Sequence, residues 1–286
     1  MQIKKYKEQF VAALLPFYDA MEIDSFFFLA LEQRKQLKRI DLALQPEIAF
    51  SETEITDWNQ ILEKLKQFIP IQYILGKAHF YGLEFEVNQS TLIPRPETEE
   101  LVAWILSDST LSSKSSLKIL DIGTGSGCIA VTLAKNLPHA HVFALDVSEK
   151  AIETAKRNAA NNLVKITFLQ QDILATEKLG QHFDIIVSNP PYVRNLEKAE
   201  IRQNVLDHEP HLALFVDDHD ALLFYRKIAG LAKLNLAESG NLYFEINQYL
   251  GKEMIGLLEE MSFQATELRK DIYGNERMVS AMLKKA

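Results

Sequence analysis

A strand, a glycine-rich loop and a helix follow one another in the middle of this chain and constrain its fold more than any other feature. Residues 117–121 predict a short buried strand, residues 122–127 form the loop, and residues 128–134 start a helix. In open α/β sheets such a turn lets backbone N–H groups and a helix N-terminus approach a ligand, because glycine has no side chain in the way. The segment therefore predicts a doubly wound α/β domain with a cofactor at this turn.

The spacing of the glycines distinguishes between cofactors. A dinucleotide fingerprint has the form Gly-x-Gly-x-x-Gly, whereas this loop has Gly-x-Gly-x-Gly with an acid two residues before the first glycine. The pattern is typical of S-adenosylmethionine sites and disfavours an NAD-dependent oxidoreductase, which remains an alternative from another class. The predicted cofactor ligands of this segment are Asp121, Gly123, Thr124, Gly125, Ser126 and Gly127.

Asp146 ends the next predicted strand, residues 141–146. Its distance along the chain from Asp121 is close to that of a carboxylate that binds a ribose. Helix N-capping is the alternative role, but Ser148 is the better cap for the helix that follows. We therefore predict that Asp146 is the ribose ligand.

Asp172 follows a further predicted strand at residues 165–170. It is predicted to accept a hydrogen bond from the adenine amino group, while Ile173 packs on the base. Helix N-capping is again the alternative. Both residues join the predicted cofactor site.

The string Asn189-Pro190-Pro191-Tyr192 follows an apolar strand at residues 183–188. Two prolines end the hydrogen-bond ladder and hold the loop rigid. The Asn189 side-chain oxygen and the Pro190 carbonyl can each accept one hydrogen from the same amino group, while Tyr192 covers its plane. We interpret these four residues, called the clamp below, as a site for a flat group that carries an NH2; an ordinary proline-rich turn is the alternative. Asn189, Pro190 and Tyr192 are the predicted catalytic residues, Pro191 joins them in binding substrate, and Asn189 is also expected to contact the cofactor.

Together these motifs resemble the class I S-adenosylmethionine-dependent methyltransferases that act on a planar nitrogen. More specifically, the chain resembles the HemK/PrmC family, the release factor glutamine methyltransferases. The strings that carry this resemblance lie at residues 70–76, 80–85, 93–99 (Ile-Pro-Arg-Pro-Glu-Thr-Glu) and 271–277. The resemblance implies methyl transfer from S-adenosylmethionine, giving S-adenosylhomocysteine, to N5 of the glutamine in the Gly-Gly-Gln motif of peptide chain release factors. It also places Arg95 beside the active site as a substrate-binding residue.

The chain departs from the family pattern at two places where glycines are usual. These are residues 215–222 and Asn247, which follows Glu245-Ile246. We expect both departures to alter outer loops and to leave the clamp and the cofactor loop untouched.

The clamp would also suit adenine N6, which is another NH2 conjugated to a π system. A DNA or RNA adenine methyltransferase is therefore the alternative function, and it would need a basic face or an inserted recognition domain together with base flipping. The formal net charge of -8 argues against affinity based on phosphate neutralisation, so no direct nucleic-acid partner is expected. A non-catalytic adaptor would have a degraded clamp, whereas this clamp is intact.

The composition predicts a globular cytoplasmic protein, most simply a monomer. No apolar run approaches the roughly 20 residues of a membrane span, the N-terminus has no secretory pattern, and one cysteine fits a reducing compartment. The string His208-Glu209-Pro210-His211 has metal-ligand residue types, but proline breaks a helical presentation and no third ligand is evident. No metal site is expected.

Three regions are predicted along the chain. Residues 1–75 show helical spacing of apolar positions and predict a small bundle that recognises the partner, residues 76–95 contain a β-hairpin linker, and residues 96–286 form the methyltransferase domain. That domain is expected to be a seven-stranded Rossmann-like sheet whose C-terminal pair, near residues 262–267 and 277–283, includes the antiparallel edge. The polar stretch 107–116 is expected to be a surface loop.

Overall fold

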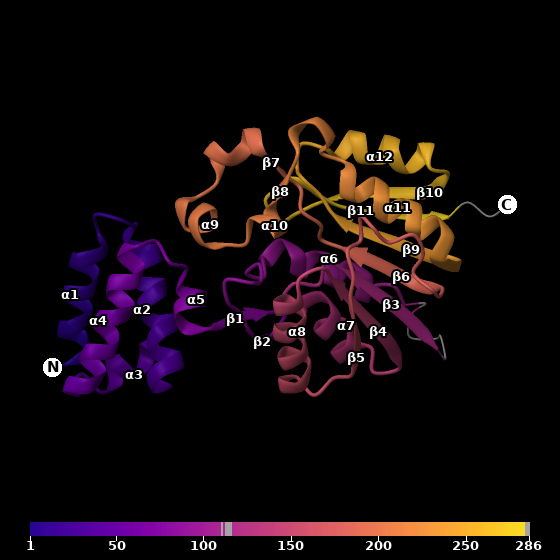
Figure 1. The fold of residues 1–286 in the computed structure, drawn as a ribbon. Helices are drawn as coiled ribbons and strands as arrows, with labels where there is room; N and C mark the ends of the chain where they lie inside the picture. Colours follow the sequence, from indigo (N-terminus) through magenta and orange to yellow (C-terminus); the bar gives the residue numbers. More distant parts are fainter. Residues whose placement is uncertain (110, 112–115, 284–286) are drawn as a thin grey trace. The chain divides into compact units, whose positions relative to one another are not determined.

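The computed structural model describes residues 1–109, 111 and 116–283. They form two compact units (Figure 1), one made of Met1–Gly76 and Arg202–His208 and the other of Lys77–Ile201 and the chain from Glu209 onward. The loop predicted at residues 107–116 lies partly outside the described residues. In the part of the chain that the structure describes, no helix combines the length and the apolar character that crossing a membrane requires.

The first unit is a helical bundle, as predicted. Its helices are α1 (Ile3–Leu14), α2 (Ala20–Lys35), α3 (Arg39–Leu44), α4 (Glu52–Lys66), α5 (Ile71–Leu75) and α9 (Gln203–His208). Trp58 of α4 lies at the centre of its core, with the rings of Phe27 and Phe50 centred 4.8 and 4.9 Å away. Ser51 caps α4 through a reciprocal pair of hydrogen bonds with Glu54, a capping box. The bundle therefore has an apolar core of its own.

Residues 202–208 belong to this first unit, although the sequence places them within 96–286. A ring nitrogen of His208 lies 2.9 Å from the carbonyl oxygen of Gln67, and Arg202 lies 3.4 Å from Glu22. Nothing in the local sequence indicates this, because the contacts join segments more than a hundred residues apart.

The second unit begins with the predicted hairpin and contains the predicted seven-stranded sheet. Strands β1 (Lys77–Phe80) and β2 (Leu83–Glu86) pair antiparallel. The strand order of the sheet is β10-β11-β9-β6-β3-β4-β5. Its strands are β3 (Leu117–Ile122), β4 (Ala140–Asp146), β5 (Ile166–Gln170), β6 (Phe183–Ser188), β9 (Leu236–Glu245), β10 (Phe263–Lys270) and β11 (Glu276–Leu283). The five strands from β9 to β5 run parallel, and β11 and β10 add the antiparallel edge.

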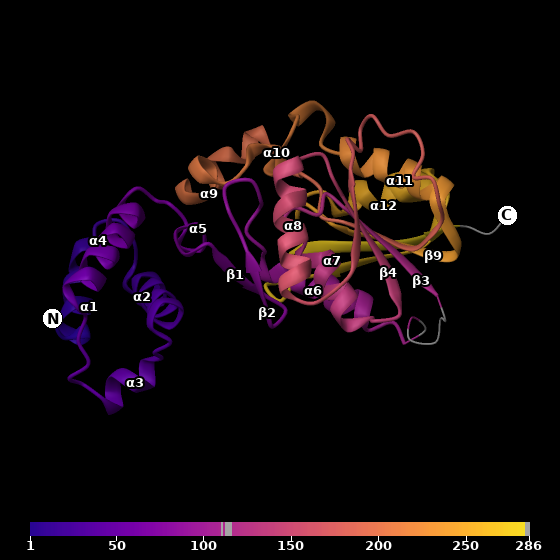
Figure 2. The same cartoon turned by 60° about the horizontal axis from the view of Figure 1, so that its bottom comes forward.

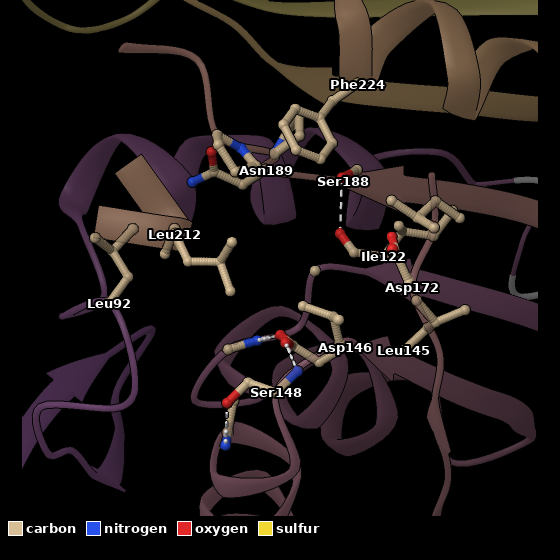
Figure 3. A pocket seen from close by; sticks show the side chains of 18 of the residues that line it. Leu92, Ile122, Leu145, Asp146, Ser148, Asp172, Ser188, Asn189, Leu212 and Phe224 are labelled. Atoms are coloured by element: carbon tan, nitrogen blue, oxygen red, sulfur yellow. Dashed lines mark hydrogen bonds between the residues drawn. The ribbon is translucent and has the colours of Figure 1, made fainter. Parts of the chain in front are cut away.

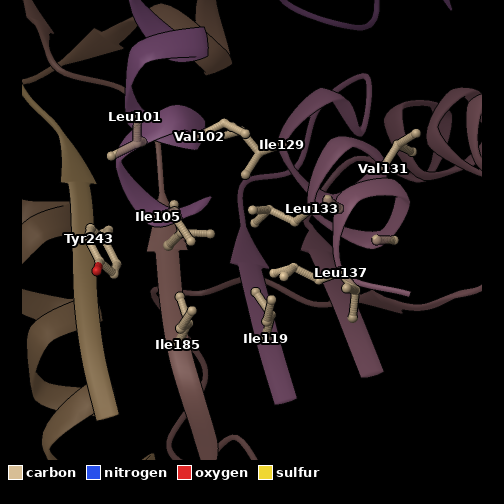
Figure 4. Packing of buried hydrophobic residues seen from close by; sticks show 14 of the residues in the cluster. Leu101, Val102, Ile105, Ile119, Ile129, Val131, Leu133, Leu137, Ile185 and Tyr243 are labelled. Carbon is tan, nitrogen blue, oxygen red and sulfur yellow. The ribbon is translucent and has the colours of Figure 1, made fainter. Parts of the chain in front are cut away.

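Helices cover both faces of this sheet (Figures 1 and 2), because neighbouring residues of a strand point to opposite faces. Ile119 and Ile185 pack under α6 (Pro96–Leu106), α7 (Cys128–Asn136) and α8 (Glu149–Asn161), as Figure 4 shows for α6 and α7. Leu120 and Ile186 belong to the second core, with α11 (Leu223–Asn235) and α12 (Gly251–Glu260). The carboxyl ends of the parallel strands therefore form one edge between two helical layers.

Short elements connect β6 to α11. In addition to α9, they are β7 (Val193–Arg194), η2 (Asn195–Glu200), α10 (His211–Leu214), β8 (Phe215–Val216) and η3 (Asp218–Asp220). Strands β7 and β8 pair with each other, directly after Tyr192. The chain that follows the clamp is thus held in place by regular backbone pairing.

Candidate functional site

A cavity of about 350 Å³ lies at the carboxyl ends of β3, β4, β5 and β6 (Figure 3), the place where doubly wound sheets bind ligands. Its volume is within the range of small-molecule sites, and its walls are mainly apolar. Of the predicted site residues, it is lined by Gly123, Gly125, Asp146, Asp172, Ile173, Asn189, Pro190 and Pro191. It is not lined by Asp121, Thr124, Ser126, Gly127, Tyr192 or Arg95.

The glycine loop adopts the left-handed backbone conformation at each of its three glycines, with φ between 56° and 83°. A Cβ atom on Gly125 would meet nothing within 4 Å, so this glycine borders open space in the cavity. A Cβ atom on Gly127 would lie 3.0 Å from the Cβ of Ala155. Gly127 therefore serves the close packing of α7 against α8, while Gly125 leaves room for a ligand.

The Asp146 carboxylate is held at the wall of the cavity by two backbone donors (Figure 3). The N–H of Gly125 donates to its Oδ2 at 2.8 Å, and the N–H of Ser148 donates to its Oδ1 at 2.9 Å. Ser148 in turn caps α8 by accepting from the N–H of Ala151, as expected. Burial raises the pKa of Asp146. Each carboxylate oxygen keeps lone pairs that can accept from a hydroxyl group, which suits the predicted ribose contact.

Asp172 and Ile173 lie on the same cavity, after the end of β5. The Asp172 Oδ1 accepts from the N–H of Leu174 at 2.8 Å, which fixes the local turn. Ile173 is buried and packs with Leu145 in the core behind the cavity. An acceptor and an apolar surface thus lie next to each other, as a purine with an exocyclic amino group requires.

Asp121 lies behind the glycine loop and not on the cavity. Its Oδ2 accepts from the hydroxyl of Thr124 at 2.6 Å, and the backbone N–H of Ala130 also faces the carboxylate. Burial is the main cause that raises the pKa of Asp121 to about 7. The structure therefore separates the predicted cofactor residues into two layers, a lining layer and a supporting one behind it.

The clamp begins where β6 ends. The Ser188 hydroxyl donates to the carbonyl of Ile122 at 2.7 Å and joins the ends of β6 and β3. Asn189 follows, and its Nδ2 donates to the hydroxyl of Thr98 at 3.3 Å. Within the described residues, no donor reaches its Oδ1, and Pro190 lines the cavity next to it. Asn189 and Pro190, the two residues predicted to supply acceptors, therefore both line the cavity.

Tyr192 is not one of the residues that line this cavity. Its hydroxyl donates to Oε1 of Glu245 at 3.1 Å, and burial raises its pKa above the ordinary tyrosine value. Burial also raises the pKa of Glu245, against two hydrogen-bond donors and the nearby Arg277.

The expectation that the Asn247 departure leaves the clamp untouched is wrong. Its Nδ2 donates to the main-chain carbonyl of Tyr192 at 3.0 Å and to Glu197 at 2.9 Å. A glycine at this position has no side chain that can reach either group. The second departure, residues 215–222, also borders the clamp, because its strand β8 pairs with β7 directly after Tyr192.

Arg95 forms an ion pair with Glu209, whose side chain is 1% exposed. The other oxygen of Glu209 accepts from the N–H of Ile93 at 3.1 Å. The pair joins the loop before α6 to the segment before α10. Leu92 of that loop and Leu212 of α10 reach one side of the cavity (Figure 3). Among the described residues no group of three metal-binding side chains comes together. Glu209, considered as a metal ligand from the sequence, forms an ion pair with Arg95 instead.

Sequence reasoning missed Thr98, Glu209, Glu245 and Asn247. Thr98 lies in the string that carries the family resemblance, and Glu245 lies two residues before the departure at Asn247, so each had a local signal. Neither signal indicates which residue the side chain contacts. Their roles depend on contacts between distant segments.

Comparisons with known proteins match both units. Residues 27–76 match the PrmC N-terminal domain, and residues 105–212 match the Methyltransferase small domain. The release factor glutamine methyltransferase of Flavobacterium psychrophilum is 61% identical over 280 residues, which cover 98% of each chain. That of Bacteroides thetaiotaomicron is 42% identical over 94% of this chain and 96% of its own. Among solved structures, the hMettl16 catalytic domain shares the fold with a TM-score of 0.55 at 16% identity, covering 82% of this chain and 84% of that one.

Proposed function

The chain belongs to the release factor glutamine methyltransferase family, and from this premise we propose that it methylates the glutamine of the Gly-Gly-Gln motif in peptide chain release factors. S-adenosylmethionine is the methyl donor, and the side-chain nitrogen N5 is the acceptor. The observation that carries the proposal is the position of Asn189 and Pro190 on a cavity that Gly125 and Asp146 also line. An NH2 group held there lies next to the proposed cofactor site.

The residues present fit the cofactor. Asp146 offers a carboxylate for the ribose hydroxyls, Asp172 an acceptor for the adenine amino group, and Ile173 an apolar surface for the base. Gly123 and Gly125 leave the backbone open toward the ligand. When bound, S-adenosylmethionine supplies a methyl group activated by its sulfonium.

An amide nitrogen is a poor nucleophile because its lone pair is delocalised into the carbonyl. Asn189 Oδ1 and the Pro190 carbonyl can accept both N–H hydrogens, which orients the nitrogen and stabilises the positive charge that it gains in the transition state. No strong general base is required, since the methylated nitrogen becomes acidic and loses its proton afterwards. The protein's main contribution is therefore to position the substrate nitrogen.

The proposal extends to the partner and the setting. The protein substrate is a release factor, and the first unit is the part that recognises it, since it has a core of its own and matches the PrmC N-terminal domain. The chain acts as a monomer in the cytoplasm, where its one cysteine stays reduced.

The test is to incubate the chain with methyl-labelled S-adenosylmethionine and a release factor, beside a factor whose Gly-Gly-Gln glutamine is replaced by glutamate. Label on the intact factor alone is the expected result. Label on added DNA or RNA, and on neither factor, would replace the glutamine with adenine as the substrate.

Asn189→Ala tests the role of the clamp in the same assay. We expect kcat to fall by about 100-fold or more, because the substrate nitrogen loses one acceptor, while the affinity for S-adenosylmethionine changes little. Equal losses in kcat and in cofactor affinity would show that Asn189 acts mainly in cofactor binding.

A further inference from the structure

We propose that Thr98 is a positioning residue which, together with Glu245, fixes the orientation of the Asn189 carboxamide so that its oxygen faces the substrate. The inference rests on the proposed function, since it concerns how the clamp presents its acceptor. A carboxamide has nearly the same shape in either orientation, yet only one orientation places an acceptor toward a substrate NH2. Something outside the clamp must select between them.

Three side chains from distant parts of the second unit form a chain of hydrogen bonds. The Asn189 Nδ2 lies 3.3 Å from the Thr98 Oγ1, and that hydroxyl donates to Oε2 of Glu245 at 2.6 Å. Thr98 lies in the first turn of α6 and is 3% exposed, and Glu245 ends β9 and is 1% exposed. Both partners are therefore held by buried regular structure.

The number of available protons determines which group donates and which accepts at each step of this hydrogen-bond chain. A threonine hydroxyl has a single hydrogen, and the ionised Glu245 carboxylate can only accept, so with Glu245 ionised the hydrogen of Thr98 is used toward Glu245. Thr98 can then only accept from Asn189, which requires the NH2 group on that side. The reversed carboxamide would place two acceptor oxygens against each other, and it would turn its own NH2 toward the NH2 of the substrate.

Glu245 is fixed from a second side by the clamp itself. The Tyr192 hydroxyl donates to its Oε1 at 3.1 Å. Arg277, whose Nε lies 3.3 Å from Asp271, adds a positive charge nearby, and Glu97 a negative one. One buried carboxylate therefore holds both ends of the clamp, Asn189 through Thr98 and Tyr192 directly. This gives Tyr192 a supporting role in the clamp.

The test compares Thr98→Val with Thr98→Ser. Valine has nearly the same shape as threonine but no hydroxyl, whereas serine keeps the hydroxyl. We expect Thr98→Val to lower kcat by about 10- to 100-fold, the range that loss of substrate orientation produces. The dissociation constant of S-adenosylhomocysteine should stay within about 2-fold in both variants, because Thr98 does not line the cavity, and Thr98→Ser should keep kcat within about 3-fold of the wild type.

Wild-type kcat in Thr98→Val, or an equal fall of kcat in both variants, would overturn the inference. The same holds for a fall of kcat that is matched by weaker cofactor binding. Thr98→Ala, which removes the hydroxyl without a branched side chain, provides the measurement if valine prevents folding. The wild type shows whether the proposed function itself fails. If the wild type methylates an adenine and not the release factor, Thr98→Val and Thr98→Ser are compared on the adenine substrate.

Discussion

Asp121 is a buried carboxyl group close to the cofactor loop, and its charge is costly at this place. Its pKa is raised to about 7, mainly by burial, whereas an aspartate in the unfolded chain titrates near 3.9. Between these two pH values the folded protein binds more protons than the unfolded chain, so the free energy of unfolding falls as the pH rises from about 4 to about 7. Above pH 7 Asp121 is ionised in both states, and the full free-energy cost of burying its charge lowers the stability of the folded protein.

Asp121→Asn should therefore stabilise the protein above pH 7, because asparagine carries no charge to bury and its oxygen can still accept from Thr124. We expect a gain of roughly 1 to 3 kcal/mol at pH 8 and a smaller one at pH 5, measured by urea unfolding without cofactor. The wild type at the same two pH values is the control. An equal difference at both would mean that the ionisation of Asp121 does not cause it.

Gly127, the residue directly before α7, lies close to Ala155 of α8. The hypothetical Cβ of Gly127 would lie 3.0 Å from Ala155, whereas that of Gly125 meets nothing within 4 Å. Both glycines have positive φ. A side chain at either position would therefore strain the backbone, but only a side chain at Gly127 would also clash with a neighbour. Of the two glycines, only Gly125 lines the cavity.

Gly127→Ala should lower the free energy of unfolding by about 2 to 4 kcal/mol, since it adds overpacking to backbone strain. Gly125→Ala is the matched control, with an expected loss of about 1 to 2 kcal/mol from strain alone and weaker binding of S-adenosylhomocysteine. Urea unfolding and calorimetric titration measure the two effects. Equal destabilisation by both would contradict the assignment of Gly127 to helix packing.

The whole molecule consists of two units with separate apolar cores. Trp58 lies in the core of the first unit, and Trp104 of α6 packs against Tyr243 in the second, with ring centroids 5.4 Å apart. The chain has 2 tryptophans in all, so each unit has its own fluorescence probe. The cavity is lined by residues of the second unit alone.

A cofactor that binds in this cavity should therefore stabilise the second unit selectively. At 100 times the dissociation constant, S-adenosylhomocysteine is expected to add about 2.7 kcal/mol to the unit that binds it. In Trp58→Phe, which leaves Trp104 as the probe, the unfolding transition should move to higher temperature with the ligand. In Trp104→Phe, which leaves Trp58, it should move little; equal shifts would show that the two units unfold as one.

The sequence by itself determined the features that depend on neighbouring residues. Short sequence patterns predict the glycine loop, the carboxylate of Asp146 at a strand end, and the Asn189-Pro190 pair. The structure brings these features together because parallel strands end at one edge of the sheet. The hairpin and the helical bundle follow from the spacing of apolar residues, and the antiparallel pair at the C-terminus follows from the fold that the family resemblance implies.

Only the tertiary structure decided which buried groups meet. Thr98 and Glu245 are 147 positions apart, and Arg95 and Glu209 are 114 apart. Asn247 reaches Tyr192, and residues 202–208 join the first unit, without any sign in their own segments. Periodicity and turn residues specify one element at a time, whereas these contacts depend on the order of strands in the sheet and on how few partners a buried polar group can reach.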